Sequence, residues 1–191
     1  EVKTRKGTQI VDTDEHPNPG ASMEMATKLS PVFKKDGTVT AFNASSLNDG
    51  AAALILMSAD KAKKLGLKPL ARVVASASAA VEPRIMGMGP VPATLKALKY
   101  AGMTLNDIDY WELNEAFAAQ ALACMQELNI PVERCNAVGS GISLGHPVGM
   151  TGARIILAAI NELKRRGGRF ACSTMCASGG PACAFIIENI N

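Results

Sequence analysis

The chain has 191 residues, of which 48% are hydrophobic and 4% are aromatic, and its formal net charge is +3. A chain of this length can bury one good-sized core, or one core and part of a second unit. The small charge and the few aromatic residues give little support to nucleic-acid binding, and no apolar run approaches the roughly 20 residues of a membrane-spanning helix. We therefore expect a soluble globular protein with neither a nucleic-acid partner nor a membrane partner.

The five cysteines show no spacing typical of a metal site, and their odd number argues against a closed disulfide framework. This usage indicates a reducing compartment, and we expect a cytoplasmic protein. Four of them lie in apolar stretches and are expected to be packing residues: Cys124, Cys135, Cys172 and Cys183. The first residues resemble mid-chain surface sequence, so we expect a fragment whose leader could lie elsewhere.

The N-terminal quarter of the chain is polar and rich in turn residues, and it predicts only a short helix near residues 22–29. Such a segment buries little, so we expect it to fold over a larger unit as a covering or binding loop. His16 lies in a turn-forming context, which favours a turn residue over a ligand. Residues 51–57 (AAALILM) then predict a buried strand, with a helix as the alternative.

The middle of the chain alternates between helix and strand signals. Ser58 can cap a helix that ends at Gly66, and residues 71–77 predict a strand. Pro92 suits the first position of a helix that ends at Gly102. Together these signals favour alternating elements.

The second half continues the same alternation. Thr104 and Asp107 resemble a capping pair before a strand at residues 110–113, after which residues 114–120 open an amphipathic helix. A helix from about residue 149 to 166 follows, with strands at 169–175 and 182–187. The pattern predicts an α/β layer sandwich.

Three loops of this predicted sandwich carry groups suited to carbonyl chemistry: Asn114, His146 and Cys176. Sites in layered α/β folds form at strand ends, and the small residues after Cys176 leave backbone amides that could stabilise an oxyanion. A thiol can act as a nucleophile or, as a thiolate, as a base. Two simpler readings remain open: Asn114 could cap its helix, and His146 could be a polar loop residue.

These stretches resemble motifs of the thiolases. Residues 114–120 (NEAFAAQ), residues 145–152 (GHPVGMTG) and the Cys176 turn are similar to the three C-terminal motifs of that family, and residues 37–52 resemble its coenzyme A loop and the following strand. The similarity covers essentially the whole chain in the family's order and spacing. It implies a layered α-β-α fold with a mixed five-stranded sheet and helices on both faces.

The resemblance also implies a domain division and an activity. Residues 1–47 would belong to the coenzyme A loop domain, 48–69 to the last strand and helix of the N-terminal domain, and 70–191 to the C-terminal domain. Thiolases interconvert two acyl-CoA molecules with a 3-ketoacyl-CoA and free coenzyme A by Claisen chemistry. Coenzyme A and acyl-CoA would therefore be substrates, and no tightly bound cofactor is expected.

The family's site residues are carried over where the motifs match. Cys176 would be the acid/base cysteine, His146 and a water held by Asn114 would stabilise one oxyanion, and the Ser178 N–H would serve a second oxyanion hole. The pantetheine and acyl pocket would be lined by Leu29, Phe33, Ala41, Ser45, Met86, Ala116 and Phe117.

The sequence also departs from the family pattern. Ser178 and Ala182 replace glycines of the cysteine turn, and Phe42 and Ser46 stand where glycines are usual. No cysteine here matches the family's nucleophilic cysteine, which belongs to an N-terminal half that we expect as a partner, within a homodimer or homotetramer.

The leading hypothesis is an acetyl-CoA acetyltransferase. A longer-chain 3-ketoacyl-CoA thiolase and a noncatalytic thiolase-like acyl-binding protein are the alternatives. The related ketoacyl synthases lack a cysteine equivalent to Cys176, which counts against them.

Overall fold

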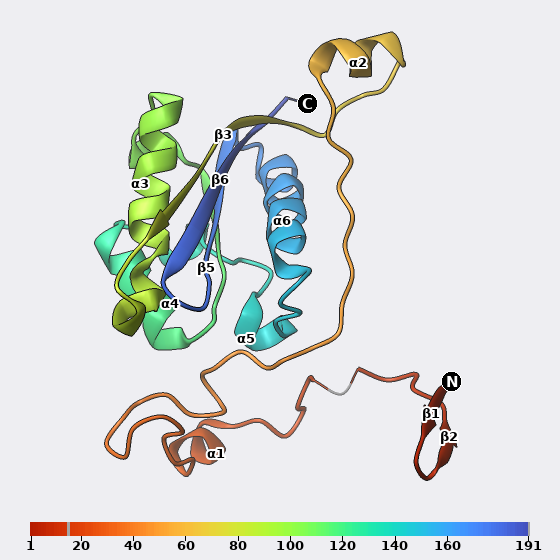
Figure 1. The fold of residues 1–191 in the computed structure, drawn as a ribbon, viewed down its shortest axis with the longest axis vertical. Coiled ribbons are helices and arrows are strands. Elements are labelled where there is room, and N and C mark those ends of the chain that lie inside the picture. The colour runs from red at the N-terminus through yellow and green to blue at the C-terminus, as the bar shows by residue number, and fades with distance from the viewer. Residues whose placement is uncertain (15, 191) are drawn as a thin grey trace.

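The computed structural model describes residues 1–14 and 16–190 (Figure 1). At its centre lies a mixed sheet in which β4 runs parallel to β5, while β3 and β5 both run antiparallel to β6. Its strands, in spatial order, are β3 (Ala71–Ala80), β6 (Pro181–Asn189), β5 (Phe170–Cys176) and β4 (Tyr110–Leu113).

Helices cover both faces of this sheet, which confirms the expected α/β architecture (Figure 1). The helices α3 (Pro90–Ala101) and α4 (Ala118–Glu127) lie on one face, and α6 (Thr151–Arg166) lies on the other. Shorter elements complete the chain: β1 (Val2–Thr4), β2 (Gly7–Gln9), α1 (Met23–Thr27), α2 (Ala59–Lys64), α5 (Gly141–Leu144) and the 3₁₀ turns Pro83–Met88, Leu105–Asp107 and Val132–Arg134.

The alternation of side chains along β6 divides the core into two layers. Ala184 and Ile186 belong to the cluster that packs against α3 and α4, whereas Ile187 packs with Leu163 of α6. Burying a side chain such as Ile186 completely contributes about 1.5–3 kcal/mol. Both faces of the sheet therefore stabilise the fold.

Local signals in the sequence fix several element ends. The Ser58 side chain accepts a hydrogen bond from the Lys61 N–H and caps α2, and Asp107 Oδ2 accepts from the Thr104 N–H at 2.7 Å. Gly102 adopts the left-handed conformation after α3, as a helix-ending glycine does. These predictions are confirmed, although α3 begins at Pro90 rather than at Pro92, since Pro90 already occupies the first helical turn.

The expected fifth strand is wrong for the described residues, in which the central sheet has four strands. Cys135 forms only an isolated parallel bridge to Trp111, beside β4. The next residue, Asn136, has a φ of +49°, and its side-chain amide bonds both the N–H and the C=O of Leu113, at 2.9 and 2.8 Å. Because the Asn136 side chain occupies the hydrogen-bonding groups of Leu113, the backbone after Cys135 cannot pair with β4 as a fifth strand.

The predicted buried strand at residues 51–57 is also wrong. This segment has no regular structure and runs as an extended connection toward α2, with Ile55 88% exposed (Figure 1). An apolar run becomes a buried strand only where a sheet edge and a covering layer are available, and neither lies beside it here. Cys183 was expected to be a packing residue, but it is exposed. Its neighbours Ala182 and Ala184 lie on the face of β6 that packs against α3, so Cys183 lies on the opposite face.

Among the described residues, no helix is both long and apolar enough to cross a bilayer.

Candidate active site

Asn114 follows the last residue of β4 and lies completely inside the protein. Its N–H donates to Thr174 O at 3.0 Å, which continues the parallel pairing of β4 with β5. Neither its side-chain Oδ1 nor its Nδ2 has a hydrogen-bond partner among the described residues. Leaving such a buried group unpaired costs about 1–3 kcal/mol, so the amide is suited to hold a polar ligand. Asn114 does not cap the following helix, which begins at Ala118.

Cys176 ends β5, two residues after the partner of Asn114. Parallel strands end at the same edge of a sheet, so the pairing of β4 with β5 brings Asn114 and Cys176 to one edge. Cys176 is only 6% exposed, and burial raises the pKa of its thiol. The thiol is therefore protonated at neutral pH and becomes a base only when a nearby group stabilises the thiolate.

The turn after Cys176 is shaped by two glycines. Gly179 and Gly180 have φ of +89° and +106°, and a Cβ on Gly180 would lie 2.2 Å from Val81 O. The N–H groups of Ala177 and Gly180 bond within the turn, whereas the N–H of Ser178 has no hydrogen-bond partner in the part of the chain that the structure describes. Ser178 is exposed at the tip, so its amide is available to an incoming group.

His146 lies half-buried between α5 and α6, in a segment, residues 141–150, that is called the His146 loop here and includes the short helix α5. Its Nδ1 is 2.7 Å from Thr151 Oγ1, and the Thr151 hydroxyl donates to Pro147 O at 3.0 Å. Because that hydroxyl has a single proton, Nδ1 must carry the proton of the imidazole and Nε2 presents its lone pair. Burial, and then the charge of Arg154, lower the pKa of His146, so the ring is neutral at physiological pH.

Two charged side chains hold the backbone of this loop. Arg154 Nη1 donates to Gly145 O at 3.0 Å, and Glu115 Oε2 accepts from the Ile142 N–H at 3.3 Å. A Cβ on Gly141 would lie 3.1 Å from Asn114 Oδ1, so the loop packs directly against the buried amide. Asn114 is therefore next to both the Cys176 strand and the His146 loop.

The covering segment, defined here as residues 1–57, closes the site through its last part. Ala44 bridges Phe117, and both the N–H and the hydroxyl of Ser45 donate to Ala116 O. Leu47 forms a parallel bridge with His146. The structure thus brings together the predicted pocket residues Ser45, Ala116 and Phe117 with His146.

The other predicted pocket residues are less closely connected. The ring of Phe33 meets Phe117 edge-on, with 5.6 Å between centroids. Met86 precedes Gly87, at which a Cβ would lie 2.8 Å from Gln120 on α4. Leu29 and Ala41 are exposed in the covering segment.

Three residues of the covering segment contact the His146 loop in ways that sequence reasoning missed. His16 Nε2 lies 3.0 Å from Ile142 O, and its Nδ1 lies 2.8 Å from Ser46 Oγ. Asn48 Oδ1 accepts from the His146 N–H at 3.2 Å. His16 is therefore more than a turn residue, but its partner is 126 positions away, and no local signal could have identified it.

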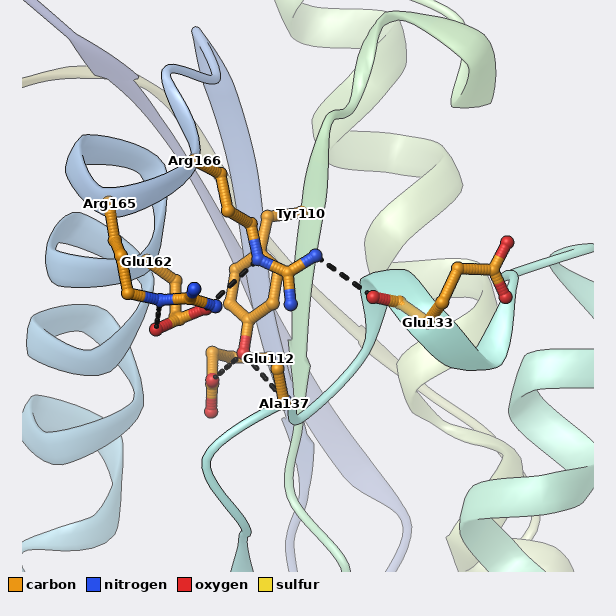
Figure 2. Close-up of polar contacts among 7 residues, drawn as sticks. All are labelled: Tyr110, Glu112, Glu133, Ala137, Glu162, Arg165 and Arg166. Atoms are coloured by element: carbon orange, nitrogen blue, oxygen red, sulfur yellow. Dashed lines mark hydrogen bonds and ion pairs between the residues drawn. The ribbon is translucent and has the colours of Figure 1, made fainter.

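A buried polar cluster on β4 lies between the sheet and α6 (Figure 2). The Tyr110 hydroxyl donates to Glu112 Oε1 at 2.7 Å and accepts from the Ala137 N–H, while Arg166 covers the Tyr110 ring. Burial raises the pKa of Glu112 to about 7. Glu162 differs, because its hydrogen bond from Arg165 lowers its pKa to about 2. No group of three or more potential metal ligands occurs within residues 1–14 and 16–190.

The layered fold thus places Asn114 and Cys176 at one edge of its sheet, and the segment that leads to His146 packs against Asn114. Residues 67–189 match the family model described as the thiolase C-terminal domain, and residues 1–60 match that of the thiolase N-terminal domain. The chain belongs to the thiolase family, a family of acyl-CoA acyltransferases.

Individual curated relatives also indicate the thiolase family. The chain is 51% identical to the mitochondrial 3-ketoacyl-CoA thiolase of Bos taurus, over 99% of this chain and 48% of the relative. It is 49% identical to the acetyl-CoA acetyltransferase of Syntrophomonas wolfei, over 98% of this chain and 48% of the relative. The chain therefore spans about half the length of the curated relatives it matches.

Solved structures give the same family. The crystal structure of human mitochondrial 3-ketoacyl-CoA thiolase in complex with CoA matches with a TM-score of 0.91 and 48% identity, covering 95% of this chain and 46% of that one. The Bacillus anthracis acetyl-CoA acetyltransferase matches with a TM-score of 0.91 and 49% identity, covering 99% and 48%.

Proposed function

We propose that this chain forms part of an acetyl-CoA C-acetyltransferase, which condenses two acetyl-CoA molecules to acetoacetyl-CoA and free coenzyme A, reversibly. The observation that carries the proposal is the buried, unpartnered amide of Asn114 between the Cys176 strand end and the His146 loop. An unpaired amide at the strand edge that carries the Cys176 thiol, packed against the segment that leads to the His146 imidazole, fits a site that must bind a water or a developing oxyanion.

His146 serves two roles in sequence. Its Nε2 lone pair first takes the proton of the nucleophilic thiol, because Nδ1 is already committed to Thr151. Once protonated, Nε2–H donates to the thioester oxygen of the attacking acetyl group, together with a water held by Asn114. The lowered pKa of His146 supports the first role, since it keeps the free ring unprotonated.

Cys176 gives its proton to the coenzyme A thiolate that leaves when the nucleophilic cysteine is acylated, and the Cys176 thiolate so formed removes the α-proton of the second acetyl-CoA. The raised pKa of Cys176 makes this thiolate a strong base, and in the reverse direction the thiol returns the proton to the leaving carbon. The Ser178 N–H stabilises the tetrahedral oxyanion formed on the acylated cysteine. Two successive oxyanions thus use separate donors.

The remaining groups come from outside these motifs. The chain covers 48% of its relatives, so the nucleophilic cysteine is assigned to an N-terminal half of the thiolase subunit, which is the partner of this chain within a cytoplasmic homodimer or homotetramer. Coenzyme A and acyl-CoA bind as substrates along the covering segment. Its contacts with Ala116 and Phe117 support that placement.

A longer-chain 3-ketoacyl-CoA thiolase is the second candidate. It is supported by the mitochondrial 3-ketoacyl-CoA thiolases of Bos taurus and Homo sapiens, which are 51% and 49% identical to this chain, against 49% for an acetyl-CoA acetyltransferase. The ratio of kcat/KM for thiolysis of acetoacetyl-CoA to that of a longer 3-ketoacyl-CoA decides between them. A ratio above one supports the acetyl-specific enzyme.

The proposal is tested by Cys176→Ser in the complete thiolase subunit. A serine hydroxyl is a far weaker base at neutral pH, so condensation is expected to fall by about 10³-fold or more, while acylation of the nucleophilic cysteine persists. Condensation is measured as the formation of acetoacetyl-CoA, and acylation is measured as the increase in the intact mass of the protein.

Cys183→Ser is the matched control, because it exchanges the same atoms at an exposed position on the neighbouring strand. It is expected to retain near wild-type condensation. Condensation by Cys176→Ser at the wild-type rate would exclude the proton-transfer role, and absence of all acyl transfer in the wild-type subunit would favour a noncatalytic acyl-binding protein.

A further inference from the structure

A chain of hydrogen bonds joins His16 in the covering segment to the backbone of His146. His16 Nε2 lies 3.0 Å from Ile142 O, and His16 Nδ1 lies 2.8 Å from Ser46 Oγ. Ser46 Oγ is 2.6 Å from Asn48 Oδ1, which accepts from the His146 N–H at 3.2 Å. The imidazole therefore contacts the His146 loop at Ile142 and, through two polar side chains, at His146 itself.

Counting protons along this chain determines the form of the imidazole. Ile142 O can only accept, so His16 Nε2 carries a proton. Asn48 Oδ1 can only accept, so the Ser46 hydroxyl donates its single proton there. That proton is then unavailable to His16 Nδ1, which must donate to Ser46 Oγ. Every bond is satisfied only when His16 is an imidazolium.

The alternative arrangement disrupts the link to His146. A neutral His16 would take the Ser46 proton at Nδ1, and Ser46 Oγ would then need a donor from Asn48. Turning the Asn48 amide supplies one, but it places the amide NH₂ against the His146 N–H, so that two donors face each other. The His146 N–H would keep only its second acceptor, Ser46 O at 2.9 Å.

The position of Asn48 is sterically coupled to the loop that carries His146. A Cβ on Gly145 would lie 2.2 Å from Asn48 Oδ1, and Gly145 has a φ of +83°. The backbone of the loop therefore lies directly against the Asn48 amide. A change in the orientation of that amide is expected to change the position of Gly145 and of the imidazole that follows it.

Charged groups occur on the segments that meet His16. Asp14 accepts from the His16 N–H on the same segment, and Asp49 follows Asn48. On the opposite side, Glu115 and Arg154 bond to the loop backbone at Ile142 and Gly145.

We propose that His16 is a positioning residue for His146 and acts as an imidazolium, through Ser46 and Asn48. This inference rests on the proposed function in that His146 is taken as a site residue. Protonated His16 fixes the Asn48 amide against the His146 N–H, and loss of that proton releases it. The covering segment thereby contributes to the orientation of the imidazole as well as to the pocket.

The test uses the full chain labelled with ¹⁵N-histidine, because His16 and His146 are its two histidines. Ring and backbone amide signals are followed by NMR between pH 5 and 8, where histidine charge changes fall. We expect the His146 backbone amide to shift with the same midpoint as the His16 ring. Ser46→Ala and His16→Gln should each abolish that shift.

Thr13→Ala is the matched control, since its exposed hydroxyl lies on the same segment and bonds to Asp12. It should leave the shift unchanged. The proposal would be overturned if the pH-dependent shift of the His146 amide signal had only the midpoint of the His146 ring, or if that shift persisted in His16→Gln. If Ser46→Ala fails to fold, His16→Gln tests the same link from the other end.

An activity measurement separates this inference from the proposed function. In the complete subunit, Ser46→Ala and His16→Gln should lower kcat for condensation about tenfold and leave KM for acyl-CoA unchanged, which corresponds to losing one charge-assisted hydrogen bond. The NMR shift requires no turnover. If the His146 amide shifts with the His16 ring but the subunit is inactive, only the proposed function is refuted. If the His146 amide does not shift with the His16 ring but the enzyme is active, only the positioning role is refuted.

Discussion

The two parts of the chain differ in how they are held in place. Residues 71–189 form a sheet covered on both faces, with core side chains such as Ile186 and Leu163 completely buried. The covering segment, residues 1–57, buries almost none of its apolar side chains, and Phe33 and Ile55 are 74% and 88% exposed. Polar contacts and one aromatic pair attach it to the site.

This difference separates stability from the assembly of the site. Apolar burial is the main stabilising contribution to folding, so the sheet and its helices determine the stability of the chain. Ser45 of the covering segment donates to Ala116 O, and Ser46 O and Asn48 Oδ1 both accept from the His146 N–H. Such hydrogen bonds contribute little net stability, but they fix the geometry of the site. Substitutions in the two regions should therefore affect different measurements.

The largest effect on stability is expected from Ile186→Ala. Ile186 is fully buried in β6, so truncation removes apolar contacts and leaves a cavity, lowering the free energy of unfolding by about 2–5 kcal/mol. Urea denaturation followed by circular dichroism measures it. Leu122→Ala on the exposed face of α4 is the control and should change the value by less than about 0.5 kcal/mol. Equal losses in both variants would contradict the two-layer core.

Glu112→Gln should change stability in a pH-dependent way. The folded-state pKa of Glu112 is raised from 4.5 to about 7, so the folded protein binds the proton more tightly than the unfolded chain. Stability is then lost as pH rises from about 4.5 to about 7, by about 3 kcal/mol at most. Glutamine removes this penalty, so the variant should be more stable than the wild type at pH 8 and similar to it at pH 4.5.

Glu162→Gln gives the opposite sign and is the control for that experiment. The pKa of Glu162 is lowered to about 2 by the hydrogen bond from Arg165, so its contribution is present above its unfolded pKa and lost as pH falls toward 2. The variant should be less stable than the wild type at pH 8. Thermal unfolding at both pH values measures both variants, and equal shifts in the two would show that burial does not distinguish the carboxyl groups.

The smallest global effect is expected from Phe33→Ala in the covering segment. Its edge-on contact with Phe117 is worth about 0.5–1.5 kcal/mol, and that energy attaches the segment without stabilising the sheet. The unfolding midpoint in urea should stay unchanged while protease cleavage within residues 1–57 becomes faster. Val32→Ala, at an exposed neighbouring position, should change neither. A lower unfolding midpoint in Phe33→Ala would show that the two regions unfold together.

The sequence by itself predicted the features that depend on neighbours in the chain. Ser58 and the pair Thr104 and Asp107 act as caps, and the strand at residues 110–113 has the predicted bounds. The motif residues Asn114 and Cys176 were identified because each follows or ends a strand of recognisable pattern. Caps and periodicity act over a few residues, so they are encoded locally.

Only the tertiary structure decided which groups are buried and what they contact. Residues 51–57 have a strand-like pattern and lie exposed because no sheet edge reaches them. The expected fifth strand does not extend beyond the isolated bridge at Cys135, because the side-chain amide of Asn136 bonds Leu113 in place of a backbone ladder. His16 meets Ile142 across 126 positions. Such contacts depend on how distant segments pack, and a pattern of nearby residues carries no information about the partner that packing will supply.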